Sequence, residues 1–164
     1  MRVLAVDPGL TRCGVAVVES GSDGKAHSLL AGVIRTDPQD ELAMRLRQVY
    51  DAVHEHLMQM NVDVLVVERV FSQNNVRTAM GTAQAAAVCM LAATQLNLPV
   101  HQHTPTEVKA AVTGSGRADK AQVAFMVGRI LGLRELPKPV DATDALALGI
   151  CHVWRSRTAV AVGR

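Results

Sequence analysis

The sequence predicts a single α/β domain over residues 1–164, built on a mixed five-stranded sheet flanked by helices. Two apolar runs, at 3–6 and 64–67, have the unbroken character of strands that are buried on both faces. Three strand patterns precede the first helical pattern, and helix and strand patterns alternate after it. We see no repeat, low-complexity segment or linker that would divide the chain.

The first three strands are expected to pair antiparallel. Pro8 and Gly9 favour a turn after the first strand, and the polar stretch 21–25 favours a second turn. Gly32 falls inside the third strand pattern. The three strands are expected at residues 2–7, 14–18 and 29–35.

The rest of the chain alternates between the two kinds of element. Apolar residues from Leu42 to Leu57 recur with helical spacing, and Asp40 and Glu41 favour a helix start before them. The helix expected at about 78–96 is rich in small residues, so it can pack closely in the core or across a dimer, and we prefer the core. The remaining elements are strands at 63–68 and 99–103 and helices at 105–113, 118–131 and 142–154.

Composition and charge exclude several classes of protein. No uncharged apolar stretch is long enough to span a membrane, and Asp7 comes too early for a signal peptide, so we expect a soluble, cytoplasmic protein. The three cysteines are widely spaced, which argues for reduced thiols rather than disulfides or a zinc site. The net charge is only +2, but residues 101–164 carry 9 Lys and Arg against 5 Asp and Glu. Positive charge in that half would attract an anionic polymer.

Four acidic residues stand where a hydrophobic core does not need them. Asp7 and Glu68 end the two apolar runs, so each is expected at the carboxyl end of a central strand, where open α/β sheets place ligands. Asp141 and Asp144 are three apart, on one helix face. Carboxylates brought together repel unless a cation compensates, and oxygen ligands favour hard ions such as Mg²⁺ or Mn²⁺. The four acids therefore predict a two-metal phosphodiester hydrolase.

Each acid also has an ordinary structural explanation. Asp7 before Pro and Gly can serve a turn, and Glu68 can form a salt bridge with Arg69 or another arginine. Asp141 and Asp144 can cap a helix or interact favourably with its dipole. The metal-site interpretation depends on the four acids together.

Six short segments carry further information in their order and spacing. They are Val-Asp-Pro-Gly-Leu at 6–10, Val-Glu-Arg-Val-Phe at 67–71, Asn75 with Gln84, Glu-Val-Lys at 107–109, Ala-Asp-Lys at 118–120 followed by Gln122-Val123, and Asp-Ala-Thr-Asp-Ala-Leu-Ala at 141–147. No single segment is specific. Together they resemble the RuvC-type Holliday-junction resolvases of the ribonuclease H-like superfamily, over nearly the whole chain.

The resemblance implies a ribonuclease H-like fold and a homodimer that cuts two opposed strands of a four-way DNA junction, in recombination and DNA repair. It implies contact with the RuvA and RuvB branch-migration proteins. Cleavage would use Mg²⁺, two ions per site with Mn²⁺ as a substitute, and would leave 5′-phosphate and 3′-hydroxyl ends. The residues that match the catalytic metal ligands are Asp7, Glu68, Asp141 and Asp144.

The resemblance also suggests residues that contact DNA. Lys109 and Lys120 would lie near the scissile phosphate, although both could be ordinary solvated lysines. Phe71, one of four aromatic residues, matches a residue that stacks on bases at the junction centre; the alternative is that it only completes the buried strand. Asn75 and Arg77 could contact phosphates or bases, and a solvated loop explains them equally well.

His101 and His103 alternate on one strand face, which raises the question of a transition-metal site. We reject that site because no cysteine or carboxylate partner has suitable spacing.

Two other functions compete with the nuclease. Residues 7–11, Asp-Pro-Gly-Leu-Thr, also match the first phosphate loop of nucleotide-binding proteins of the actin and sugar-kinase type. Those proteins need a second lobe and a second phosphate loop, for which 164 residues leave no room. A non-catalytic junction-binding protein would keep the fold alone, and the presence of all four acids argues against it.

Overall fold

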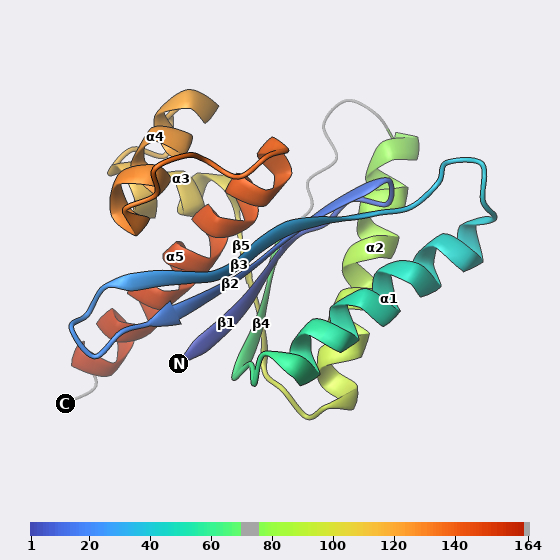
Figure 1. The fold of residues 1–164 in the computed structure, drawn as a ribbon, viewed down its shortest axis with the longest axis horizontal. Coiled ribbons are helices and arrows are strands. Elements are labelled where there is room, and N and C mark those ends of the chain that lie inside the picture. Colours follow the sequence, from blue (N-terminus) through green and yellow to red (C-terminus); the bar gives the residue numbers. More distant parts are fainter. Residues whose placement is uncertain (70–75, 163–164) are drawn as a thin grey trace.

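The structure is a computed structural model that describes residues 1–69 and 76–162, and it confirms the mixed five-stranded sheet (Figure 1). The order of the strands is β3-β2-β1-β4-β5. The neighbours β1–β2 and β2–β3 are antiparallel, whereas β1–β4 and β4–β5 are parallel. The strands are β1 (Arg2–Asp7), β2 (Arg12–Ser20), β3 (Ala26–Arg35), β4 (Val64–Glu68) and β5 (Val100–His103).

Helices cover both faces of the sheet (Figure 1). On one face lie α1 (Leu42–Gln59) and α2 (Val76–Gln95). On the other lie α5 (Val140–Val162), α3 (Pro105–Thr113) and α4 (Lys120–Leu131). The layers explain why the chain alternates between helix and strand after β3.

Strand β1 is buried on both faces, which accounts for its unbroken apolar run. Val3 and Ala5 belong to the core beneath α5, whereas Leu4 and Val6 belong to the core beneath α1 and α2. All four are 0% exposed. Successive side chains of a strand point to opposite faces, so β1 contributes to both hydrophobic cores.

Local signals set the bounds of the two short helices. The helix predicted at 105–113 matches α3, because Thr104 and Glu107 form a capping box and Gly114 ends the helix with a φ of 81°. The helix predicted from residue 118 begins instead at Lys120. Asp119 is its N-cap, and the Asp119 side chain accepts a hydrogen bond from the backbone N–H of Gln122.

Three other elements are longer than the sequence indicated. β2 begins at Arg12 and ends at Ser20, because its polar ends still pair with neighbouring strands. β3 begins at Ala26, opposite Ser20, rather than at residue 29. α5 runs to Val162, beyond the predicted end at residue 154.

Two expectations from composition also concern the fold. Cys13, Cys89 and Cys151 are buried and free of disulfides. Over the ranges that the structure describes, no helix is both long and apolar enough to pass through a membrane.

Candidate active site

Two of the four predicted acids lie side by side at one end of the sheet. β1 and β4 are adjacent and parallel, with Val6 opposite Val67. Asp7 and Glu68 follow these two residues, so both carboxylates stand at the carboxyl ends of central strands. Among the side chains that the structure describes, which do not include that of Arg77, Glu68 makes no ion pair, so its explanation as an arginine salt bridge has no support there.

The first turn of α5 brings the other two acids to the same end. Gly14 of β2 is opposite Asp7, and the backbone of Asp141 rests against it. A Cβ atom at position 14 would lie 2.1 Å from the carbonyl oxygen of Asp141 and 3.3 Å from Cβ of Asp7. Sequence reasoning did not identify Gly14, although a glycine inside a strand often marks a close backbone approach.

The four acids share one electrostatic environment. Burial raises the pKa of Asp7 to about 7, and the negative charges of Glu68, Asp144 and Asp141 add to the increase in that order. Burial and the charge of Asp144 also raise the pKa of Glu68. Half-buried carboxylates that repel one another, with oxygen as the donor atom, suit a hard divalent cation.

Basic side chains contact two of these acids. Lys120 Nζ lies 3.1 Å from Asp144 Oδ2, and this hydrogen bond is the main reason that the pKa of Lys120 is raised. Arg12 Nε lies 3.7 Å from Asp141 Oδ2. Arg12 is therefore a member of the site that sequence reasoning missed, because nothing in its local sequence distinguishes it from a solvated arginine.

Both predicted lysines line a small cavity beside the acids. The cavity has a volume of about 200 Å³, and its polar walls are Glu68, Lys109, Lys120 and Asp144. Over the described part of the chain, no three His, Cys, Asp or Glu side chains are close enough together to hold a metal ion. The four carboxylates therefore do not form a complete metal site in their present positions. The donor atoms thus fit a cation in chemistry, and the carboxylates would have to turn toward it.

Three residues that were predicted to contact DNA have side chains outside the part that the structure describes. Phe71 and Asn75 lie outside the described residues. Arg77 belongs to the first turn of α2, and its side chain also lies outside the described part.

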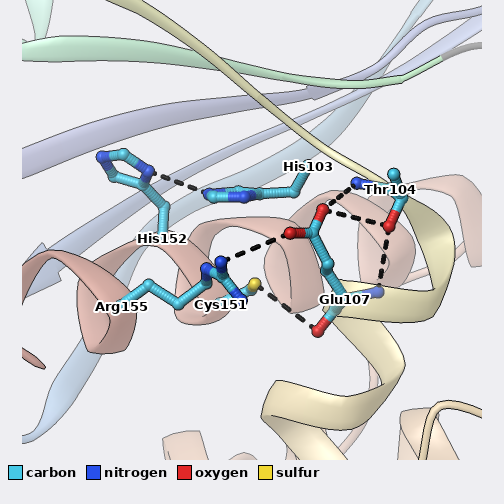
Figure 2. Close-up of polar contacts among 6 residues, drawn as sticks. All are labelled: His103, Thr104, Glu107, Cys151, His152 and Arg155. Atoms are coloured by element: carbon cyan, nitrogen blue, oxygen red, sulfur yellow. Dashed lines mark hydrogen bonds and ion pairs between the residues drawn. The ribbon is translucent and has the colours of Figure 1, made fainter.

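A second cluster of polar side chains connects β5 and α3 to α5 through hydrogen bonds and an ion pair (Figure 2). His103 Nε2 lies 3.1 Å from His152 Nδ1, and the rings of His101 and His152 have centroids 4.9 Å apart. Glu107 accepts a hydrogen bond of 2.8 Å from the backbone N–H of Thr104.

Glu107 also reaches α5 directly. Its carboxylate pairs with Arg155 at 3.3 Å, and its carbonyl accepts a hydrogen bond from the Cys151 thiol at 3.8 Å (Figure 2). These contacts hold α3, which carries Lys109, against α5, which carries Asp144. Sequence reasoning missed this cluster because His152 is far from His101 and His103 in the sequence.

Comparisons with known proteins agree with this geometry. The family model described as crossover junction endodeoxyribonuclease RuvC matches residues 3–152. A protein of that name from Parafrankia sp. (strain EAN1pec) is 59% identical over 155 residues, which is 94% of this chain and 87% of the relative. One from Streptomyces avermitilis is 58% identical over 156 residues, covering 95% and 89% of the two chains.

Solved structures give the same result. The Thermus thermophilus RuvC structure superposes with a TM-score of 0.90 at 34% identity, covering 97% of each chain. The T. thermophilus RuvC in complex with Holliday junction substrate superposes with a TM-score of 0.91, covering 97% of this chain and 96% of that one. The chain described here therefore belongs to the family of crossover junction endodeoxyribonucleases known as RuvC.

Proposed function

We propose that this chain is a structure-specific endodeoxyribonuclease that resolves four-way Holliday junctions in recombination and repair. It nicks two opposed strands and leaves 5′-phosphate and 3′-hydroxyl ends. The observation that carries the proposal is the meeting of Asp7, Glu68 and Asp144 beside a cavity lined by two lysines. Membership of the RuvC family supports the choice of DNA, as does the likeness to the Thermus RuvC that was solved in complex with Holliday junction substrate.

Members of this family are metal-dependent nucleases, and we propose Mg²⁺ as the ion, two per site, with Mn²⁺ as a substitute. When bound, the metal would lower the pKa of an attacking water and stabilise the leaving 3′ oxygen. The oxygen donors and the raised pKa of Asp7 support this proposal, since burial and then the neighbouring negative charges raise that pKa, and a bound cation would offset both effects. The ligands would be Asp7, Glu68, Asp141 and Asp144.

The two lysines would act on the phosphate rather than on the metal. Lys109 and Lys120 line the same cavity as Glu68 and Asp144, so a phosphodiester placed there meets fixed positive charge. Such charge offsets the negative charge that develops in the transition state. Lys120 also donates a hydrogen bond to Asp144, which lines the same cavity.

A homodimer would provide the two active sites that paired nicks require, and α2 offers a suitable surface. One side of α2 is in the core, as the sequence analysis preferred, and includes the buried residues Ala85, Ala86, Cys89, Ala92 and Ala93. The opposite side is exposed yet apolar. It comprises Val76, Met80, Ala83, Ala87 and Leu91, which follow the helical repeat.

This exposed stripe of α2 suits a second copy of the chain. Val76 is 75% exposed, Met80 59% and Leu91 50%, which is costly in water. Ala83 and Ala87 stand between them and would let two helices approach closely. Contact with RuvA and RuvB, and a cytoplasmic location, are proposals that rest on family membership alone.

The test is cleavage of a synthetic four-way junction beside a linear duplex of the same sequence, with Mg²⁺ and with EDTA. Paired nicks on the junction alone, dependent on Mg²⁺, are the expected result. Metal-dependent cutting of both substrates would indicate a less selective nuclease. Binding without cutting would favour the junction-binding protein that keeps the fold without the chemistry.

A further inference from the structure

A second, larger hollow lies against α4. Its volume is about 650 Å³, and Thr113, Ser115, Arg117, Gln122, Phe125 and Met126 are among its walls. The small cavity of the active site is lined by Lys120 and Val123 of the same helix. α4 therefore separates the two spaces, and a strand that reaches one passes close to the other.

Phe125 is unusual among the aromatic residues that the structure describes. The residue is 64% exposed and lines the hollow, whereas Tyr50 and Trp154 are half-buried. Burying its side chain would be favourable, and the core of α4 is already supplied by Val123 and Val127. The ring thus presents an apolar face to whatever occupies the hollow.

Arg117 supplies the positive charge there. Its side chain is exposed, and within the described residues its guanidinium group makes no hydrogen bond or ion pair. Asp119 is the only acid in the wall; its carboxylate stays negative but accepts a hydrogen bond from the N–H of Gln122 as the N-cap of α4. Arg117 is the basic residue of the wall and would be the counter-charge of an anionic group in the hollow.

We propose that this hollow holds one nucleotide of the substrate strand, with its base on the ring of Phe125 and its phosphate on Arg117. The inference rests on the proposed function. An aromatic ring beside an arginine is the combination that binds unpaired nucleotides, since every base can stack and every phosphate is anionic. The volume exceeds what a single nucleotide needs and lies in the usual range of ligand pockets. Lys120, one residue beyond the N-cap of α4, lines the neighbouring cavity of the active site, so each of the two spaces has a basic side chain in its wall.

The test measures binding of a four-way junction in EDTA, where no cleavage occurs, by fluorescence anisotropy. Phe125→Ala should weaken binding about tenfold, and Phe125→Tyr should restore it, because the ring that stacks is restored. Arg117→Gln should make the binding constant fall less steeply with salt concentration. The slope of log K against log salt should change by the amount that corresponds to one lost phosphate contact. Met58→Ala, which alters an equally exposed apolar residue on α1, is the matched control and should leave both quantities unchanged.

A direct reporter distinguishes stacking from a general loss of affinity. A fluorescent adenine analogue is moved base by base along one junction arm, and quenching at one position should vanish in Phe125→Ala and persist in Phe125→Tyr. Wild-type binding and quenching in Phe125→Ala and Arg117→Gln would overturn the inference and leave the hollow to a protein partner. If the wild-type protein neither binds nor cuts the junction, the proposed function fails first and the inference with it.

Discussion

His103 Nε2 and His152 Nδ1 lie 3.1 Å apart, so a hydrogen bond between two imidazole rings joins the end of β5 to α5. One ring must donate an N–H and the other must accept it, which excludes a pair in which both rings are protonated. Burial, followed by the charges of His103 and His101, lowers the pKa of His152 to about 4. Burial also lowers the pKa of His103, where Glu107 opposes the shift and Arg155 adds to it.

The first prediction is that the stability contributed by His152 is lost as the pH falls below about 6.5, whereas the raised pKa of Asp7 acts on stability in the opposite direction. Unfolded histidine titrates near 6.5, and the folded pKa of His152 is lower, so its contribution is complete above 6.5 and is lost on the way down to about 4. Chemical denaturation of the wild-type protein and of His152→Gln at pH 7.5 and pH 5 cancels the contribution of Asp7, which both proteins share. His152→Gln should be less stable than the wild type at pH 7.5, and the difference should shrink at pH 5 by on the order of 1 kcal/mol. An equal difference at the two pH values would contradict the assignment.

The second prediction concerns the acids. Asp144→Asn should abolish cleavage of a four-way junction while binding stays within about twofold, because the substitution removes a proposed metal ligand and not the basic surface. Asp51→Asn, an equally conservative change on the exposed side of α1, should cut normally. Gel assays of cleavage and of binding on the same preparations provide the comparison, and normal cleavage by Asp144→Asn would falsify the site.

The third prediction distinguishes a role of Lys120 in the cleavage step from a general attraction of DNA to positive charge. Lys120→Gln should slow single-turnover cleavage about 100-fold, with a much smaller loss of affinity, because its charge acts mainly in the transition state. Lys138→Gln removes the same charge from an exposed position that does not line the cavity and is the control. Equal effects of the two variants on rate would mean that Lys120 only attracts DNA.

The fourth prediction uses two glycines that both lie inside strands. Gly14→Ala should destabilise the fold by roughly 1–3 kcal/mol and impair cleavage, because the new methyl group would overlap the backbone of Asp141. Gly32→Ala should be close to neutral, because nothing lies within 4 Å of a Cβ atom there. Thermal unfolding and cleavage rates check both variants, and similar results for the two would rule out the close contact as the cause.

The fifth prediction tests the exposed stripe of α2. Ala87→Glu should convert a dimer into a monomer, because it places a charge in the centre of an apolar helix contact. Met44→Glu, on an exposed position of α1, should leave the dimer intact. Light scattering after size-exclusion chromatography measures the mass, and a dimer that survives Ala87→Glu places the interface elsewhere.

Much of this architecture could be predicted because its signals are local. The strands β1 and β4 are apolar without interruption, so their burial and the position of Asp7 and Glu68 followed directly. The bounds of α3 followed from Thr104 and Gly114. The assignment of the four acids as metal ligands stays a prediction.

What could not be predicted depends on residues that are distant in the sequence. The true length of β2 is set by its pairing with β1 and β3, and its own end residues are polar. The contact of Gly14 with Asp141 and the hydrogen bond of His103 with His152 depend on how α5 lies across the sheet. A pattern within one segment contains no information about such a contact.

The position of α5 affects how such an enzyme can gain stability and how its sequence can change in evolution. Its first turn presents the acids, and its later turns meet β2 so closely that a methyl group at Gly149 would lie 2.5 Å from a side-chain carbon of Val18. If α5 moves as one rigid body, repacking at Val18 would also displace Asp141 and Asp144 in its first turn. Selection for heat resistance in this core therefore acts on catalysis as well, and the two properties should change together in variants of β2 and α5.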